Sequence, residues 1–357
     1  MTNTLRLYDL KAAKLMPESL NPGCGIRAIA WSPNGQTIAA GCEDHQVRLW
    51  SPFSANVSSI LGADGTKEAW ALAFSPDNET LAVGYDDETG GDLETLKLWN
   101  IRSGQEICGL NGHSAMVTGV AFSRDGSRVY STGYDKSIKV WDVKSKTFIE
   151  DLGQHVGEIK SLSISCDGQT LASAGKDRLV KLWDTSTQKE RLALSAHEGF
   201  LHAAEFDPTG TLIASSDNTS EVRVWNAHSG HLERLIHDTV EVLALAFSPS
   251  GDQLATANED GLISFYDMNG ESLPKQFTVH KGQATALAYA PDGKTLATGG
   301  ADGTVRLWHV GAGRELLAFK DLRARVNRIA FSANGQHLAA ALLDGSVHIW
   351  HASSMKE

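Results

Sequence analysis

The fold can be read most directly from one stretch of the chain, VTGVAFSRDGSRVYSTGYDKSIKVWD (117–142). In VTGVAF (117–122) and SIKVW (137–141) the larger apolar side chains recur at every second position, so they lie on one side of an extended chain. Both stretches are also rich in β-branched residues, which predicts β-strands. SRDG (123–126) predicts a hairpin turn, because glycine tolerates the positive φ that the last turn position needs. The stretch therefore predicts short antiparallel strands that end at Trp141.

The same pattern recurs along the whole chain at a nearly constant interval. Aromatic residues end such runs with successive gaps of 49, 42, 42, 42, 41, 42 and 42 residues, at Trp50, Trp99, Trp141, Trp183, Trp225, Tyr266, Trp308 and Trp350. A turn signal precedes each aromatic: SPNG (32–35), SPDN (75–78), SRDG (123–126), SCDG (165–168), DPTG (207–210), SPSG (248–251), APDG (290–293) and SANG (332–335). A further apolar run after the aromatic, as in RELLAF (314–319), completes four strands per repeat.

Four antiparallel strands in about 42 residues are typical of one propeller blade. A single blade cannot bury both of its faces, so blades must stack around an axis and close. The eight units predict an all-β chain that forms one closed eight-bladed β-propeller over residues 1–357. The second unit is longer, and DDETGGDLET (86–95) is predicted to be a surface insertion in its hairpin.

Dipeptides at fixed places in these units make the chain resemble the WD-repeat family. They are GH at 112–113, WD at 141–142 and 183–184, and WN at 99–100 and 225–226. The resemblance covers nearly the whole chain and implies a propeller that binds other proteins. Seven blades are the commonest number in that family, so a seven-bladed ring is the alternative.

The N-terminal residues 1–16 are predicted to help close the ring. TLRLYDL (4–10) resembles the tryptophan-bearing strand, Tyr8 lies 42 residues before Trp50, and a further strand is expected at 11–16. Only HASSMKE follows Trp350, so the N-terminal strand can complete the last blade and remove an exposed edge. The alternative is that Met1 begins a piece cut from a longer array.

The charge balance narrows the classes of partner. The formal net charge of −11 repels phosphate backbones, so we expect neither a nucleic-acid nor an anionic-membrane partner. No signal peptide and no stretch of about 20 apolar residues is present. The four cysteines lack CxxC spacing and are interpreted as reduced thiols, with a Cys24–Cys42 bridge as an alternative. We therefore expect a cytoplasmic or nuclear protein that is a monomer within a larger complex.

A histidine, a hydroxyl residue, an aspartate and a tryptophan recur at fixed spacing in several units. Each set could be a hydrolase triad, but a catalytic site is needed once and these sets repeat. An indole also follows each set at a fixed interval, placed to donate to the hydroxyl, and none of the serines lies in a GxSxG elbow. In the WD-repeat family such residues form a buried hydrogen-bonded chain, and the resemblance implies the same structural tetrads here: His113, Ser131, Asp135 and Trp141; His155, Ser173, Asp177 and Trp183; His280, Thr298, Asp302 and Trp308. We predict no catalytic residue, no metal and no cofactor.

Two further blades carry an altered form of this tetrad, and a row of basic residues recurs beside it. His197 and Ser215 keep the interval, with the aspartate displaced to Asp217, whereas His237, Thr256 and Asp260 differ by one residue. Basic residues recur two places before the aromatic and are predicted to form ion pairs between blades: Arg6, Arg48, Lys97, Lys139, Lys181, Arg223 and Arg306.

The resemblance also implies a binding face, where three positions per blade are expected to take no part in blade packing. In blades two to five these positions carry large apolar side chains and cations: Trp70, Met116, Tyr134, Lys160, Lys176, Phe200 and His202. Such residues are typical of interface hot spots, so this arc is predicted to capture an extended peptide or loop with an apolar anchor and an acidic residue.

The hypothesis is thus a non-catalytic protein-interaction scaffold. The alternative is an adaptor with one dominant ligand, such as a substrate receptor, a ligase adaptor or a chromatin-peptide reader. An enzyme with a site in the central channel is disfavoured, because the innermost strands are expected to be nearly all small and apolar, as in ALAF (71–74), ALAY (286–289) and RIAF (328–331).

Overall fold

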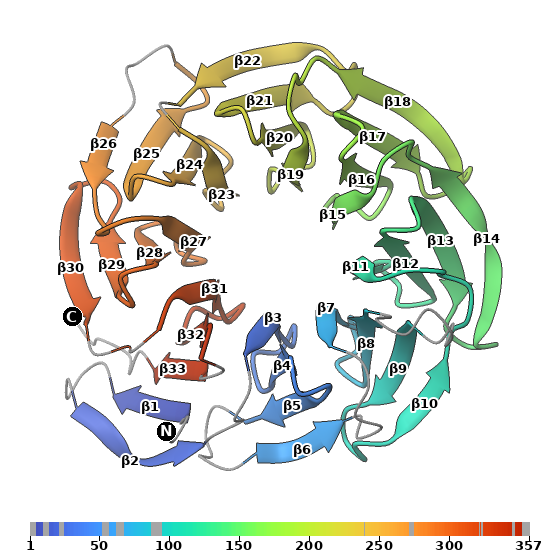
Figure 1. The fold of residues 1–357 in the computed structure, drawn as a ribbon, viewed down its shortest axis with the longest axis horizontal. Helices are drawn as coiled ribbons and strands as arrows, with labels where there is room; N and C mark the ends of the chain where they lie inside the picture. The colour runs from blue at the N-terminus through green and yellow to red at the C-terminus, as the bar shows by residue number, and fades with distance from the viewer. Residues whose placement is uncertain are drawn as a thin grey trace.

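The computed structural model describes residues 5–9, 14–20, 25–51, 57–61, 68–86, 95–238, 240–270, 275–320, 322, 324–344 and 347–351. These residues form eight antiparallel sheets arranged in a ring around a central channel, with the first strand of each sheet innermost (Figure 1). The predicted all-β propeller with eight blades is confirmed, and the seven-bladed alternative is wrong. Most of the predicted insertion at 86–95 lies outside the described residues.

The blades follow one another along the chain. The first four contain β3 (Ile26–Trp31), β4 (Ile38–Cys42), β5 (Val47–Trp50) and β6 (Val57–Leu61); β7 (Ala69–Phe74), β8 (Thr80–Tyr85), β9 (Leu96–Asn100) and β10 (Glu106–Gly109); β11 (Val117–Phe122), β12 (Arg128–Gly133), β13 (Ser137–Asp142) and β14 (Thr147–Gln154); and β15 (Ile159–Ile164), β16 (Thr170–Gly175), β17 (Leu179–Asp184) and β18 (Lys189–Ser195).

The next three contain β19 (Leu201–Phe206), β20 (Leu212–Asp217), β21 (Glu221–Asn226) and β22 (Leu232–His237); β23 (Val242–Phe247), β24 (Gln253–Asn258), β25 (Leu262–Asp267) and β26 (Lys275–Thr278); and β27 (Ala284–Tyr289), β28 (Thr295–Gly300), β29 (Val305–His309) and β30 (Arg314–Phe319). The eighth sheet has the order β2 (Lys14–Leu20), β1 (Leu5–Asp9), β33 (Val347–His351), β32 (His337–Leu342) and β31 (Val326–Phe331).

The hairpin turns between the first and second strands adopt the conformation that their sequences predict. The last residue of every turn signal has a positive φ, at Gly35, Asn78, Gly126, Gly168, Gly210, Gly251, Gly293 and Gly335. Seven of these eight residues are glycine, which adopts this region without the strain caused by a Cβ atom. The amide of Gly126 also donates to the carbonyl of Ser123 at 2.9 Å, which closes the turn.

The hydrophobic core lies between neighbouring blades rather than within one. One cluster joins Leu96 and Leu98 of the second blade to Phe122, Val129 and Trp141 of the third. Each blade therefore buries its faces on its two neighbours, as the repeat pattern predicts.

The ring closes by the same kind of contact between the first and eighth blades. Trp50 and Ile38 share a core cluster with Ile349. The amide of Asn327 donates to the carbonyl of Ile26 at 3.3 Å. These contacts join residues about 300 positions apart in the chain, so the first and last blades are neighbours (Figure 1).

The N-terminal strand lies beside the last blade, in a different way from the other outer strands. β1 pairs in parallel with β33, with Tyr8 opposite Trp350, and β2 then pairs antiparallel with β1. The eighth sheet thus has five strands instead of the four of a standard blade. That this segment is what closes the ring stays a prediction.

The recurrent basic residues pair inside their own blades, so the prediction of ion pairs between blades is wrong. The pairs are Arg48–Asp44 at 2.5 Å, Lys97–Glu106 at 3.1 Å, Lys139–Asp151 at 2.6 Å, Lys181–Glu190 at 2.8 Å, Arg223–Glu221 at 2.5 Å and Arg306–Glu315 at 2.6 Å. Four of these carboxylates lie on the fourth strand of the same blade, about 5 Å from the third strand, whereas stacked sheets are about 10 Å apart. The other two, Asp44 and Glu221, are four and two residues from their partners along the chain. The side chain of Arg6 lies outside the described residues.

Candidate functional site

The three predicted tetrads are present, and each links strands of one blade. His155 Nδ1 lies 2.9 Å from Asp177, His155 Nε2 lies 2.7 Å from the Ser173 hydroxyl, and Trp183 Nε1 donates to that hydroxyl at 2.9 Å. The His113 tetrad has the corresponding distances 2.8, 2.7 and 2.8 Å. In the His280 tetrad they are 3.0, 2.9 and 3.4 Å, so the bond from Trp308 to Thr298 is the longest of the set.

A fourth tetrad forms in the fifth blade in spite of its displaced aspartate. His197 Nδ1 lies 2.8 Å from Asp217, His197 Nε2 lies 2.7 Å from Ser215, and Trp225 donates to Ser215 at 2.9 Å. Asp217 is the last residue of β20, and from there its carboxylate reaches the same histidine atom that a turn aspartate contacts in the other blades.

The related set in the sixth blade does not form a tetrad. The side chain of His237 is 66% exposed and faces Glu221 at 3.7 Å, while the buried hydroxyl of Thr256 contacts no hydrogen-bond partner among the described residues. Asn258 instead donates to Asp238 at 2.8 Å. The one-residue difference in spacing thus places Asp238, and not His237, against the blade.

The tetrad side chains are buried and are hydrogen-bonded to one another within their blades. The side chains of His113, His155, His197 and His280 are 0% exposed. Burial lowers the pKa of His197 more than Asp217 raises it, which favours the neutral imidazole. Burial opposes ionisation of Asp135, but hydrogen bonds from His113 and Ser137 outweigh it and hold the pKa at about 2. No substrate can reach these groups, and each polar atom already has a partner.

One group of potential metal ligands coincides with a tetrad. Atoms of His197, Asp217 and Glu221 lie within 4.8 Å of one another. His197 and Asp217 are joined by the tetrad hydrogen bond, and Glu221 pairs with Arg223 at 2.5 Å. The hydrogen bonds of the blade thus account for this group.

The predicted binding residues lie on the face that carries the connections into each first strand and between each second and third strand, here called the loop face. On this face the structure brings Tyr134, Lys160 and Lys176 together. The ammonium groups of Lys160 and Lys176 lie 4.1 and 5.8 Å from the centroid of the Tyr134 ring. Glu158 lies 2.8 Å from Lys176 and 3.9 Å from Lys160. Hydrogen bonding to Glu158 raises the pKa of Lys176.

The other predicted binding residues belong to separate contacts. The Arg27 guanidinium covers the Trp70 ring at 4.5 Å from its centroid, and Trp70 is half-buried. His202 contacts Glu241 at 2.6 Å. Phe200 is 45% exposed, and Met116 is half-buried just before β11. The arc is therefore a group of neighbouring clusters rather than one continuous site.

The sequence pattern also matches a family model. The model of the WD domain, G-beta repeat, matches residues 19–51, 104–142, 146–184, 188–226, 229–267, 271–309 and 317–351. The chain is a WD-repeat protein. Residues 52–103, which include most of the second blade, lie outside the matched stretches.

Parts of the chain are similar to parts of several larger curated proteins. It is 30% identical over 151 residues to periodic tryptophan protein 2 homolog of Dictyostelium discoideum, covering 31% of this chain and 16% of that protein. It is 27% identical over 136 residues to the transcriptional corepressor LEUNIG_HOMOLOG of Arabidopsis thaliana, covering 38% and 16%. It is 32% identical over 134 residues to coronin-7 of Bos taurus, covering 34% and 14%. The matches thus span about a sixth of the length of these curated relatives.

A solved structure shows the same fold over the full chain. The crystal structure of the computationally designed Ika8 protein matches with a TM-score of 0.81 at 24% identity, and covers 99% of this chain and 100% of that one. At that identity the likeness concerns the fold alone. In the part of the WD-repeat chain that the structure describes, no helix is long and apolar enough to cross a membrane.

Thr118 and Thr285 lie four residues before the ends of β11 and β27, the same position as Trp70, Lys160 and His202 in their blades, and both join neighbouring blades. The hydroxyl of Thr118 donates to the carbonyl of Ile159 in the next blade at 2.7 Å, and Thr285 bonds the carbonyl of Val326 in the same way. The expectation that such positions take no part in blade packing is therefore wrong for these two.

Sequence reasoning missed three residues with functional potential. Val156 is 81% exposed on the loop face, directly after the tetrad residue His155, and so falls outside the three positions considered in each blade. Glu205 on β19 and Arg328 on β31 are exposed charges on innermost strands. The expectation of a nearly all-apolar channel wall is wrong at these positions, although both residues stand plainly in LHAAEF (201–206) and VNRIAF (326–331).

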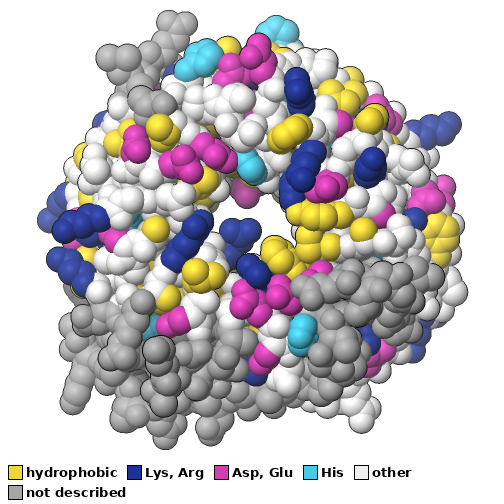
Figure 2. Space-filling model, in the orientation of Figure 1, with side chains coloured by type: hydrophobic (Ala, Val, Ile, Leu, Met, Phe, Trp, Pro, Cys, Tyr) yellow, Lys and Arg dark blue, Asp and Glu magenta, His cyan; other side chains and the backbone are white. Residues whose placement is uncertain are grey.

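Charged side chains surround the mouth of the central channel, with hydrophobic side chains beside it on the side of β7 and β11 (Figure 2). A pocket of about 230 Å³ in this channel is lined by residues of five blades, among them Arg27, Trp70, Lys160 and Arg328. The channel of this WD-repeat protein is therefore polar where it meets the loop face.

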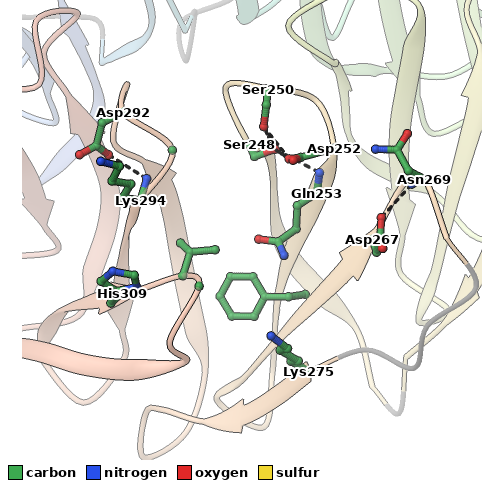
Figure 3. A pocket seen from close by; sticks show the side chains of 14 residues that line it. Ser248, Ser250, Asp252, Gln253, Asp267, Asn269, Lys275, Asp292, Lys294 and His309 are labelled. Carbon is green, nitrogen blue, oxygen red and sulfur yellow. Dashed lines mark hydrogen bonds between the residues drawn. The ribbon is translucent and has the colours of Figure 1, made fainter.

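A larger pocket of about 780 Å³ lies between the sixth and seventh blades, away from the loop face. Figure 3 shows Asp252 beside the hydroxyls of Ser248 and Ser250, and Lys294 beside Asp292. These carboxylates receive hydrogen bonds from their own turns, so they serve turn formation. Gly293, the last residue of the predicted turn APDG (290–293), has a φ of 68° and belongs to a hairpin turn, as predicted.

Proposed function

We propose that this WD-repeat protein is a non-catalytic scaffold that binds partner proteins on its loop face. The observation that carries the proposal is the exposure of large apolar side chains there, Val156 at 81% and Phe200 at 45%, in two neighbouring blades. Exposed apolar residues close to charged ones are typical of interface centres surrounded by a polar rim. Lys176, which follows the second strand of the blade that Val156 precedes, supplies such a charge.

The non-catalytic part of the proposal is supported by the burial of the histidines. The groups that resemble triads are inaccessible, and their hydroxyls at Ser131, Ser173, Ser215 and Thr298 are 0% exposed. The relatives carry names as different as a transcriptional corepressor, a coronin and an autophagy-related protein, which supports a shared interaction module more than a shared reaction. We place the scaffold in the cytoplasm or nucleus.

The alternative, an adaptor with one dominant ligand, is favoured by the position of the exposed and clustered residues. Tyr134, Lys160, Val156 and Phe200 belong to the third, fourth and fifth blades, which are consecutive in the ring. A single arc of this kind suits one ligand. The stoichiometry of captured complexes separates a scaffold with several partners from an adaptor with one.

The test is affinity capture with the double variant Phe200→Ala/Val156→Ser. Leu316→Ala is the matched control, because Leu316 is 46% exposed but lies on the outer strand β30. We expect partner recovery to fall about tenfold or more in the double variant, since loss of an interface anchor costs roughly 2 kcal/mol or more. The control and the melting temperature should not change. Full recovery of the partners with the double variant would overturn the proposal.

A further inference from the structure

The eighth blade places two arginines where the central channel meets the loop face. Arg328 lies on the innermost strand β31 and lines the channel pocket, and Arg325 directly precedes that strand. The carbonyl of Arg325 accepts a hydrogen bond from the amide of Leu343 at 2.8 Å. Leu343 is itself 49% exposed, so an apolar side chain accompanies the two cations.

Among the described residues, these arginines differ from Arg27 in having no carboxylate within ion-pair distance, although Glu205 acts on Arg328 from farther away. Arg27 contacts Glu43 at 2.9 Å and Glu68 at 3.1 Å, and Lys160 bonds the hydroxyl of Tyr134. Within the described ranges, Arg328 donates only to the carbonyl of Asn327 at 3.1 Å, and the buried Nε of Arg325 has no hydrogen-bond partner. Arg328 is solvent-accessible where it lines the channel pocket, so its guanidinium is open to an anionic group of a ligand, which would also give the buried Nε of Arg325 a nearby acceptor.

The electrostatics of the channel wall agree with that geometry. Arg328 is solvent-accessible, but the channel wall around it removes part of its hydration and lowers its pKa; the neighbouring charge of Arg325 lowers it further, while Glu205 acts in the opposite direction. Glu205 is a weak counter-charge, because loss of hydration in the channel wall raises its pKa to about 7. The positive charge of Arg328 lowers this pKa but does not cancel the effect of desolvation.

We propose that Arg325 and Arg328 bind an anionic group, a carboxylate or a phosphate, of a partner peptide that enters the channel from the loop face. The proposal rests on the proposed function, since the rest of the peptide lies across that face. Guanidinium groups bind carboxylate and phosphate through paired hydrogen bonds. The pocket of about 230 Å³ accommodates such a group with a few waters, each of which occupies about 30 Å³. The acidic residue of the ligand thus goes to the channel and not to Lys160 and Lys176, which already contact Tyr134 and Glu158.

A peptide fits the charge distribution better than a nucleic acid does. A nucleic acid offers a row of phosphates and needs a matching row of cations. Here Glu43, Glu68 and Glu158 accompany the cations of the mouth, and the net charge of the chain is −11. The overall field therefore repels polyanions, and only a local anionic group can gain from the two arginines.

The test is calorimetric titration of the full chain with a blocked tetraglutamate peptide and with inorganic phosphate, and with a blocked tetraglutamine peptide as the uncharged probe. The variant is Arg325→Gln/Arg328→Gln. The matched control is Arg102→Gln/Arg124→Gln, which removes the same charge from exposed turns away from the loop face. We expect the affinity of the channel variant for both anions to fall about tenfold or more, since two charge-assisted bonds are lost, with the control unchanged.

Three results would overturn the proposal. They are equal anion affinity in the channel variant, no binding of either anion by the unmodified protein, and tighter binding of single-stranded oligothymidine than of tetraglutamate at the same salt concentration. Melting temperatures of the variants identify any that fail to fold. If the glutamine variant does not fold, Arg325→Lys/Arg328→Lys replaces it, because lysine keeps the positive charge but cannot form the paired hydrogen bonds of a guanidinium group. Failure here is distinct from failure of the proposed function, because the Phe200→Ala/Val156→Ser variant keeps both arginines and reports on partner capture alone.

Discussion

Two adjacent serines on β20 provide a sharp test of the tetrads, because both are buried and only one has partners. Ser215 accepts from Trp225 at 2.9 Å and contacts His197 at 2.7 Å. The hydroxyl of Ser216 is equally buried, at 1% exposure, but has no hydrogen-bond partner in the described part of the chain. The substitutions Ser215→Ala and Ser216→Ala remove the same atom from neighbouring positions.

The expected costs differ because of what each hydroxyl leaves behind. Ser215→Ala leaves the indole N–H of Trp225 and one nitrogen of His197 without a partner, and each buried unpaired group costs about 1–3 kcal/mol, which gives about 2–6 kcal/mol together. Ser216→Ala removes an unsatisfied hydroxyl and should change the free energy of unfolding by less than about 1 kcal/mol, in the stabilising direction. Urea unfolding followed by tryptophan fluorescence measures both values. Equal costs for the two variants would refute the assignment of stability to the tetrads.

Three more predictions concern stability and are measured by the same urea titration. Thr298→Val should cost less than Ser173→Ala, because Trp308 lies 3.4 Å from its acceptor whereas Trp183 lies 2.9 Å from Ser173; the reverse order would contradict this. Gly126→Ala should cost about 1–2 kcal/mol, because φ is 73° at this turn; an unchanged midpoint would argue against the turn. Glu205 has a folded pKa of about 7, above its ordinary value of 4.5, so the folded state binds the proton more tightly and loses stability as pH rises through this window. Glu205→Gln should therefore gain stability relative to the unmodified protein between pH 5 and 8, by about 1 kcal/mol after screening by channel water, and a gain independent of pH would contradict the pKa.

The fold was predictable because its determinants are local. The residue at the end of each hairpin turn, such as Gly126, and the aromatic that ends each third strand report the conformation of their own segment. The tetrads were predictable from spacing, since the antiparallel register brings residues such as His155 and Ser173 together in every blade. The ring then follows from the need of each blade to bury both faces.

The candidate site was less predictable, because it depends on which of several nearby charged residues each side chain pairs with. A spacing of nine residues separates the partners in three of the ion pairs, Lys97–Glu106, Lys181–Glu190 and Arg306–Glu315. This spacing is visible in the sequence, but the prediction considered only partners in the neighbouring blade. The sixth blade shows the limit of spacing alone, because a shift of one residue replaces His237 by Asp238.

The role of the channel arginines was hidden for a different reason. Whether Arg325 and Arg328 have acidic partners depends on side chains from other parts of the ring, and no local pattern contains that information. The distinction between these residues and Arg27, which has two carboxylate contacts, appears only in three dimensions.

Cross-linking mass spectrometry of the chain bound to a captured partner tests the central claim most directly, because it locates the interface without altering it. Lysines are available on the loop face at Lys160 and Lys176, and away from it at Lys144 and Lys189, near the outer strands. We predict that cross-links to the partner form at the first pair and not at the second. Cross-links confined to Lys144 and Lys189 would contradict binding on the loop face.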